Sequence, residues 1–306
     1  DVLVLEVGMG GEWDSTNVAD GDVAVFTPIS MDHAERLGNT IAEIATTKSG
    51  IIKPGSFVVT SRQTPEALEV LKAKAAELAD NFAEYGDRFE VIETVATDLG
   101  QTFKVRTLAG EYQDIHLPVH GDYQAENAAL AIAAVEAFMG YGNVRIIDDV
   151  IRASLADASS PGRLQVLQRD PLVLLDAAHN PGGAEALASA LKTSFNKPYA
   201  VGVIGVLGDK DATSFFEALD DSLIEVVITQ SNSPRATPAE ELAETARKVL
   251  GADRVHVEPK PLAAIDLAVS LLPTAEALRG AVVVTGSITL IGEVLKLKQK
   301  EIDQDG

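Results

Sequence analysis

The chain has 306 residues, 46% of them hydrophobic, and this length is enough for two domains with cores of their own. A formal net charge of −21 disfavours nucleic acid and anionic membranes as partners, and no apolar run reaches the ~18 residues of a membrane-spanning helix. The absence of cysteine excludes disulfides, thiolate catalysis and cysteine-bound zinc, and it is consistent with a reducing cytoplasm.

The first half of the chain alternates short apolar runs with helical patterns, which is typical of βαβ units. The expected buried strands of a parallel sheet are 2–7, 23–27 and 57–60. Three further segments alternate as antiparallel strands do, with Ala109-Gly110 as a hairpin turn, and they are 89–93, 102–108 and 111–117. The expected helices are 40–48, 65–79, 122–139 and 147–155.

A small, polar stretch, "ADASSPGR" at 156–163, is the best domain boundary in the chain. It predicts one domain at 1–158 and another at 159–306. The expected strands beyond it are 172–176, 199–206, 224–229 and 281–285, and the expected helices are 183–195, 212–219, 238–250, 261–272 and 288–298. The fold class predicted for the chain is therefore α/β, with two doubly wound domains and a small antiparallel edge in the first.

The glycines of "EVGMGGEW" invite a dinucleotide-binding interpretation, but Trp13 stands where the third glycine of that fingerprint belongs. A P-loop is excluded from this sequence because it contains no Gly-Lys pair. A metal site agrees better with the residues. Glu6 lies near the carboxyl end of the predicted strand 2–7, and Asp32 and His33 lie just past the strand 23–27; such strand ends line a crevice. A carboxylate and an imidazole brought together there suit Mg²⁺, because substrate phosphates supply part of the ligands of this ion. Spacing alone is equally consistent with Glu6 binding loop amides and His33 capping a helix.

Lys48 has a structural interpretation from its position alone. It lies in the last turn of a predicted helix, before Gly50 as C-cap, where a cation complements the helix dipole. Gln124 and Asn127 are three residues apart at a helix start, so they share a face on which amide groups can meet a base or phosphate. Polar residues are also routine in a first helical turn.

A second strand-to-helix junction, "LLDAAHNPGG", carries polar groups at its turn. Asp176 ends the strand where a ribose or an adenine amino group is read at the crevice. His179 is a candidate for proton transfer or phosphate contact, or a simple turn histidine. Arg163 lies at the presumed hinge, where its guanidinium can bind a phosphate bidentately.

Seven ordered motifs from Glu6 to Val294 together resemble one family. They are "EVGMGGEWDSTNV", "ISMDHAERLGNTIAEIATTKSGIIKPG", "HGDYQAENAALA", "PGRLQVL", "DAAHNP", "GVLGDKD" and "VTGSITLIGEV". In this order they resemble the folylpolyglutamate synthases and dihydrofolate synthases of the Mur ligase superfamily.

The resemblance implies an ATP-dependent amide ligase of folate biosynthesis. ATP phosphorylates a carboxylate of folate or dihydropteroate, and L-glutamate then attacks the acyl phosphate, with Mg²⁺ stabilising charge on the phosphoryl group. The resemblance also implies small-molecule partners only, a cytoplasmic location and a monomer.

Residue by residue, the resemblance implies a role for each motif. Glu6 and His33 match the magnesium ligands, and Lys48 matches a lysine that CO₂ converts to a carbamate. The positions that match ATP contacts are Asn127, Arg163 and Asp176, while His179 matches a histidine near the phosphates. The positions that match pterin contacts are Trp13, Asp14 and Ser15. Asp209, Lys210 and Asp211 resemble a cleft loop.

Three departures from the family pattern are visible. Glu12-Trp13-Asp14-Ser15 stands where the family more often has Arg-Leu-Asp-Ala, and Thr47 stands where it usually has Glu. The glycine-rich P-loop has no counterpart, and its expected place is upstream of Asp1. We therefore expect the first domain to be truncated and this chain alone to show little or no ligase activity.

Two other functions agree with parts of the sequence. One is a different Mur-type amino-acid ligase, with other carboxylates and amines as substrates. The other is a nucleotide-binding fragment without catalysis. Within the family, the residues do not separate dihydrofolate synthase, folylpolyglutamate synthase and the bifunctional enzyme.

Overall fold

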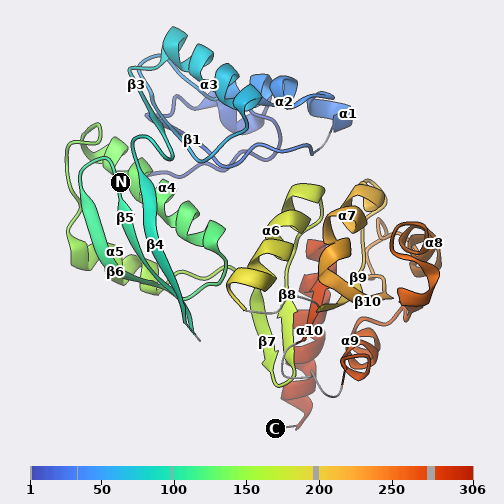
Figure 1. Cartoon of the computed structure of the whole chain (residues 1–306). Helices are drawn as coiled ribbons and strands as arrows, with labels where there is room; N and C mark the ends of the chain where they lie inside the picture. Colours follow the sequence, from blue (N-terminus) through green and yellow to red (C-terminus); the bar gives the residue numbers. More distant parts are fainter. Residues whose placement is uncertain (1, 33, 98, 196–199, 274–279, 306) are drawn as a thin grey trace. The chain divides into compact units, whose positions relative to one another are not determined.

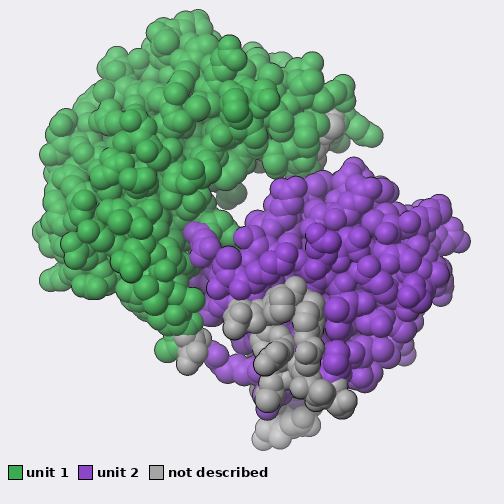
Figure 2. Space-filling model, in the orientation of Figure 1, with its two compact units in different colours: residues 1–118, 123–158 green, residues 119–122, 159–306 purple. Residues whose placement is uncertain are grey.

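The computed structural model describes residues 2–32, 34–97, 99–195, 200–273 and 280–305 (Figure 1). The chain divides into two compact units, coloured separately in Figure 2. Unit 1 comprises Asp1–Pro118 and Tyr123–Ala158, and unit 2 comprises Val119–Asp122 and Ser159–Gly306. The sequence did not predict that Val119–Asp122 groups with unit 2, where the His120 ring lies 4.7 Å from that of Phe195.

Unit 1 contains two three-stranded sheets. The parallel sheet has the order β1-β2-β3, and the antiparallel sheet has the order β4-β5-β6. The strands are β1 Val23–Phe26, β2 Phe57–Thr60, β3 Asn81–Glu84, β4 Glu90–Thr97, β5 Gly100–Arg106 and β6 Glu111–Leu117. The helices are η1 Ser15–Val18, α1 Ala34–Leu37, α2 Ile41–Ser49, α3 Pro65–Leu78, α4 Asp122–Gly140 and α5 Asp148–Ala156.

Helices α2 and α3 cover the same face of the parallel sheet. Both connect adjacent parallel strands in the same direction, and right-handed crossovers then place both on one side. Their apolar residues, including Ile44 and Leu71, form one core cluster with Phe26 and Val58 of the strands. Each helix begins at a threonine N-cap, Thr40 for α2 and Thr64 for α3.

The prediction of a buried strand at 2–7 was wrong. This segment has no strand pairing among the described residues, and the side chains of 2–6 are exposed, with Val4 88% accessible. Apolar, β-branched residues favour extended backbone, but burial requires neighbours on both faces of a strand. In the described structure β1 pairs with β2 and not with this segment, so Glu6 does not lie at a strand end.

The antiparallel sheet is fixed to α4 by a buried carboxylate. Glu136 is fully buried and accepts hydrogen bonds from Thr107 Oγ1 at 2.9 Å, Ala109 N at 3.0 Å and Tyr112 Oη at 2.7 Å. Burial, and next the bond to Glu136, raise the pKa of Tyr112 to about 12. The hairpin of β5 and β6 is thereby locked onto the second half of α4.

Unit 2 is built on one six-stranded sheet with the order β11-β10-β9-β12-β8-β7, parallel except for β7. The strands are β7 Gln165–Arg169, β8 Leu172–Leu175, β9 Ala200–Ile204, β10 Leu223–Ile228, β11 Val255–Val257 and β12 Ala281–Thr285. The helices are α6 Pro181–Thr193, α7 Ala212–Leu219, η2 Asp220–Ser222, α8 Ala239–Leu250, η3 Ala252–Arg254, α9 Pro261–Ser270 and α10 Ile288–Asp305.

The crossovers of unit 2 place its helices on both faces of the sheet. The connections through α6, α7 and α8 run in one direction across the sheet, and the connection through α9 runs back. Right-handed crossovers therefore put α9 opposite the other three. Alternate residues of the central strands, such as Val203 and Val284, pack against α9 and α10 in one core cluster. This is the doubly wound architecture that the sequence predicted.

No helix among the described residues is long and apolar enough to cross a membrane.

Candidate functional site

The glycine-rich loop of unit 1 packs against the C-terminal end of α2. A Cβ on Gly11 would lie 2.8 Å from the carbonyl oxygen of Lys48, and a Cβ on Gly10 would lie 3.1 Å from Cγ2 of Thr47. The Glu12 amide donates to the Thr47 carbonyl at 3.0 Å. These glycines therefore serve a close approach between loop and helix, and the small, buried Thr47 fits that contact.

Asp14 holds this loop together from within. Its carboxylate accepts hydrogen bonds from Met9 N at 3.0 Å, Thr16 N at 3.0 Å and Thr16 Oγ1 at 2.7 Å. These bonds, led by the Thr16 hydroxyl, lower the pKa of Asp14 to about 2. Its neighbours Trp13 and Ser15 are exposed, with Trp13 75% accessible.

Of the residues predicted for the metal and the carbamate, Glu6 and Lys48 lie next to this loop. Lys48 is half-buried in the last turn of α2, and Gly50 is the C-cap, as predicted. Glu6 is exposed in the extended segment before the glycines. His33, the other predicted magnesium ligand, lies outside the described residues. Among the residues that the structure describes, no group of three or more His, Cys, Asp or Glu is arranged to hold a metal ion.

The carboxyl edge of the parallel sheet is organised by Gln63, which the sequence analysis missed. Gln63 Oε1 accepts from Ile29 N at 2.9 Å, and its amide nitrogen donates to the Thr27 carbonyl at 2.9 Å. It thereby ties the loop after β1 to the loop after β2. A glutamine before a helical Pro65 carries no sequence signal for such a role.

Asn127, the predicted ATP contact of unit 1, is exposed in the second turn of α4. Its side-chain nitrogen lies 3.5 Å from Gln124 Oε1, so the two amides share a face, as predicted. Next to them, Arg62 lies 3.6 Å from Glu126 and places its guanidinium 4.8 Å from the ring centre of Tyr85.

Asp176 in unit 2 lies directly after β8 and is buried. Its two oxygens accept backbone hydrogen bonds from Leu164 and Ala178, each at 2.9 Å. Burial raises the pKa of this carboxyl group, although the two amides, Arg163 and His179 act in the opposite direction. Asp176 thus fastens the loop that carries Arg163 beside the turn that carries His179.

His179 and Arg163 complete this group. His179 Nδ1 lies 2.9 Å from the Ala177 carbonyl oxygen. Because a carbonyl oxygen only accepts, Nδ1 carries a proton and Nε2 is the basic nitrogen of the neutral ring. Arg163 is exposed. Asn180, which follows His179, caps α6, because its side-chain oxygen accepts a hydrogen bond from Gly183 N at 2.8 Å. Pro181 is the first residue of the helix.

A second set of polar residues in unit 2 surrounds the carboxyl ends of β9, β10 and β12. Asp209 of the predicted cleft loop accepts two hydrogen bonds from Arg235, both at 2.8 Å. Asp211 caps α7 through Ser214. The sequence did not single out the serine and threonine residues near these strand ends, Ser231, Ser287 and Thr289, because short polar side chains after strands are common in any loop.

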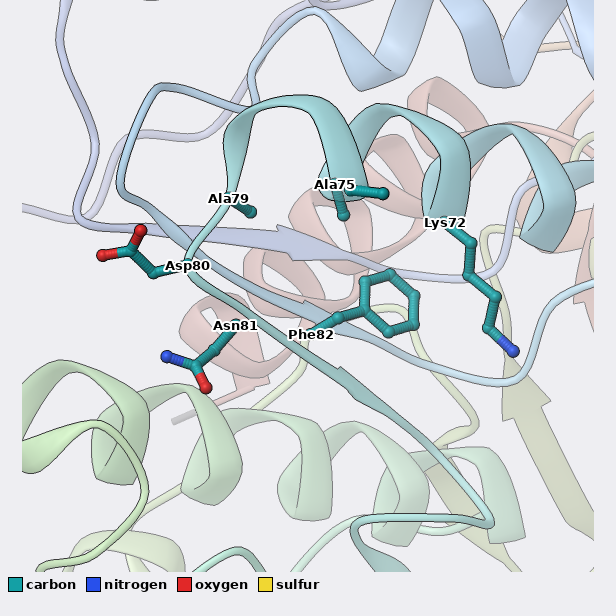
Figure 3. Close-up of a pocket in the computed structure, with 7 residues that line it drawn as sticks. Lys72, Ala75, Ala79, Asp80, Asn81 and Phe82 are labelled. Carbon is teal, nitrogen blue, oxygen red and sulfur yellow. The ribbon is translucent and has the colours of Figure 1, made fainter.

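A groove of about 370 Å³ lies along α3 and the start of β3 (Figure 3). Its lining residues are Lys72, Ala75, Ala76, Ala79, Asp80, Asn81 and Phe82. The Lys72 ammonium group pairs with Glu84 at 2.6 Å. None of the predicted site residues lines this groove.

Comparison with known proteins identifies the two units. A family model described as "Mur ligase middle domain" matches residues 1–135, and one described as "Mur ligase, glutamate ligase domain" matches residues 162–288. The fold and these matches define a Mur-ligase-type protein.

Individual relatives narrow this class. The chain is 44% identical to a dihydrofolate synthase/folylpolyglutamate synthase of Mycobacterium tuberculosis over 95% of this chain and 63% of that protein. It is 33% identical to a protein of the same description from Bacillus subtilis, over 97% of this chain and 67% of the relative. A crystal structure of M. tuberculosis folylpolyglutamate synthase complexed with ADP and AMPPCP matches with a TM-score of 0.88 and 43% identity, over 95% of this chain and 67% of that one. The chain belongs to the dihydrofolate synthase/folylpolyglutamate synthase family of the Mur ligase superfamily.

Proposed function

We propose that this chain forms the greater part of an ATP-dependent ligase that joins L-glutamate to a carboxylate of folate or dihydropteroate. The observation that carries the proposal is the gathering of Arg163, Asp176 and His179 at the carboxyl end of β8, in a chain of this family. The chain spans 63% of the length of the M. tuberculosis relative, so the activity of the whole protein is part of the proposal.

The proposed reaction has two steps. A carboxylate oxygen of the pterin substrate attacks the γ-phosphorus of ATP, and ADP leaves. The amino nitrogen of L-glutamate then attacks the acyl carbon, phosphate leaves, and the attacking nitrogen loses a proton. Both steps place negative charge on oxygen atoms that fixed donors must meet.

The residues of unit 2 are assigned to the nucleotide and to proton transfer. Arg163 presents an exposed guanidinium, whose fork matches phosphate oxygens. Asp176 holds the Arg163 loop through Leu164 and contacts the ribose with its remaining lone pairs. His179 Nε2 accepts the proton of the attacking amine or contacts the phosphate.

The residues of unit 1 are assigned to the base, the metal and the pterin. Asn127 reads the adenine edge with its exposed amide. The nitrogen of Lys48 adds to CO₂ and releases a proton, which gives an anionic carbamate at the end of α2. Trp13 offers an exposed ring to the pterin, next to Ser15, while Asp14 keeps the loop folded around them.

Mg²⁺ suits the donors assigned to it in part. The exposed carboxylate of Glu6 is a hard oxygen ligand, and this ion needs only one or two protein groups when substrate phosphates supply the rest. Glu6 and His33 are the residues assigned to hold it. When bound, the ion neutralises charge on the transferring phosphoryl group.

Nucleotide binding is the first test of this proposal. Isothermal titration of Mg-AMPPCP into the whole protein is expected to give saturable binding, which Arg163→Ala weakens. Arg152→Ala is the matched control, because Arg152 pairs with acidic residues of its own helix and a carbonyl of β6. Equal binding by both variants, or none by the parent protein, refutes the assignment.

The substrates are tested by ADP release from the whole protein, because this chain alone is expected to show little or no ligase activity. Release that requires L-glutamate together with dihydropteroate or tetrahydrofolate supports the ligase, and the preferred pterin separates the two family activities. ADP release that does not depend on L-glutamate contradicts it. A monomer in the cytoplasm belongs to the same proposal, and sedimentation velocity measures the oligomeric state.

A further inference from the structure

The carboxyl ends of β9 and β12 mark the point in unit 2 where the chain connections diverge. β9 leads into α7, whereas β12 leads into α10 on the opposite face of the sheet. Ligands of open α/β sheets bind in the crevice at such a point. The two strand ends are in close contact, since a Cβ on Gly286 would lie 2.8 Å from the carbonyl oxygen of Gly205. Only glycine fits there, where φ is +105°.

A loop after β10, residues 230–237, is fastened to α10 by Glu293. The Asn232 backbone amide donates to Glu293 Oε2 at 2.7 Å, and the Asn232 side-chain amide donates a short hydrogen bond to Glu293 Oε1. Ser231 Oγ and Thr289 Oγ1 lie 3.1 Å apart beside this contact. Because Glu293 holds both the main chain and the side chain of one residue, it fixes the direction of the 230–237 loop.

The same loop is also fastened on its other side. Arg235 donates two hydrogen bonds of 2.8 Å to the carboxylate of Asp209, which follows β9. The Gly208 amide donates to the Arg235 carbonyl at 2.9 Å, and the Thr237 amide donates to the Val206 carbonyl at 3.0 Å. The loop is therefore tied to both segments that border the crevice, after β9 and after β12.

We propose that Glu293 is a positioning residue for the amino-acid substrate. It acts through Asn232, and it holds the 230–237 loop as a wall of the crevice between the carboxyl ends of β9 and β12, in which a small α-amino dicarboxylate binds. Thr289 is half-buried at this wall, where its hydroxyl lies 3.1 Å from Ser231 Oγ and donates to Ser287 Oγ at 3.3 Å, so the wall and the start of α10 share one hydroxyl network beside the proposed ligand. The identity of the ligand as L-glutamate rests on the proposed function.

The test is a titration of L-glutamate into the ¹⁵N-labelled chain, followed by amide chemical shifts. The parent is expected to show saturable shifts at Gly205, Ser231 and Gly286. Glu293→Ala is expected to weaken binding about tenfold, which corresponds to ~1.4 kcal/mol. Glu293→Gln keeps one acceptor oxygen and is expected to fall between the two. Glu301→Gln is the matched control, since Glu301 lies on the same helix in an exposed pair with Lys298.

A second titration with Mg-AMPPCP separates positioning from general damage to the fold. Glu293→Ala is expected to leave nucleotide affinity unchanged, and equal losses for both ligands overturn the proposal. If the alanine variant does not fold, Glu293→Gln and Asn232→Asp take its place, and their affinities for L-glutamate and for Mg-AMPPCP are compared in the same way. Asn232→Asp sets two carboxylates against each other. A parent that binds L-glutamate, with variants that bind it equally well, overturns the role of Glu293 and leaves the proposed function standing. A parent that binds nucleotide but no L-glutamate overturns both.

Discussion

Replacement of Glu136 by alanine is expected to destabilise unit 1 by about 4 kcal/mol. Glu136 accepts three hydrogen bonds inside the protein, and one donor, Thr107, has a second acceptor in the Gly110 carbonyl at 3.0 Å. The variant therefore leaves the Ala109 amide and the Tyr112 hydroxyl without acceptors. An unsatisfied donor inside the protein costs about 1–3 kcal/mol, and the buried Tyr112 hydroxyl and the half-buried Ala109 amide together give the sum.

Glu136→Gln separates the hydrogen bonds from the packing of the side chain. Its one carbonyl oxygen can accept from only part of the donor set, so about 1–3 kcal/mol is expected to be lost. Urea denaturation followed by circular dichroism gives the free energies of unfolding. Glu69→Gln, on the exposed side of α3, is the control, and it is expected to change stability by less than ~0.5 kcal/mol.

The ionisation of Tyr112 provides an independent check of the same contact. Beside burial, Glu136 helps to raise the pKa of Tyr112 to about 12, because it accepts a hydrogen bond from the Tyr112 hydroxyl and carries a negative charge. Either variant is expected to lower this pKa, which an absorbance titration of the tyrosines measures. Loss of less than ~1 kcal/mol in Glu136→Ala, together with an unchanged tyrosine titration, would refute the reasoning.

Three further predictions concern the loops of the candidate site. Because the pKa of Asp14 is lowered from 3.8 to about 2, its support of the loop is present above pH 3.8 and is lost as the pH falls through about 2. The chemical shift of the Met9 amide is expected to titrate with a midpoint at about pH 2, and this titration is expected to disappear in Asp14→Asn. Burial raises the pKa of Asp176 above 3.8, so the unfolded parent loses this proton at a lower pH than the folded parent does. As the pH rises from 3.8 the parent is therefore expected to lose stability relative to Asp176→Asn, and a gain would contradict this sign. Gly11→Ala places a Cβ 2.8 Å from a backbone carbonyl of α2 and is expected to destabilise the protein by about 1–3 kcal/mol, as measured by thermal unfolding. Gly292→Ala in α10 is the control in this assay: its Cβ meets nothing within 4 Å, and the variant is expected to stabilise the protein by about 0.5–1 kcal/mol.

The elements that the sequence predicted well are long or strongly bounded. The helix expected at 122–139 is α4, Asp122–Gly140, and the strand expected at 281–285 is β12. Helical periodicity over many residues, or an unbroken run of buried β-branched residues, carries enough signal for this. The strands that were missed, β3, β7 and β11, have three to five residues each and lie at or beside a sheet edge, where polar residues are tolerated.

The prediction of a strand at 2–7 failed although its sequence signal was strong. The pattern of this segment is as apolar as that of β12, yet the side chains of 2–6 are exposed in the described structure and those of β12 are buried. Apolarity in a sequence records a tendency to be buried, whereas burial itself depends on which neighbours the fold supplies. The placement of Glu6 depended on that strand and was lost with it.

The carboxylates of the candidate site show a limit of another kind. The sequence placed Asp176 at the end of a predicted strand, where the structure has it, but a position in the sequence does not reveal which groups the oxygens of Asp14 or Asp176 accept from. In the structure Asp14 accepts hydrogen bonds from Met9 and Thr16 of its own loop, whereas Asp176 accepts one from Ala178 of its own turn and one from Leu164 of the loop that carries Arg163. Arg163 and Asn127, by contrast, present exposed polar ends. The half-buried Asp14 and the buried Asp176 shape loops through the hydrogen bonds that they accept, and the exposed ends of Arg163 and Asn127, with the remaining lone pairs of Asp176, are the groups that we propose for nucleotide contact.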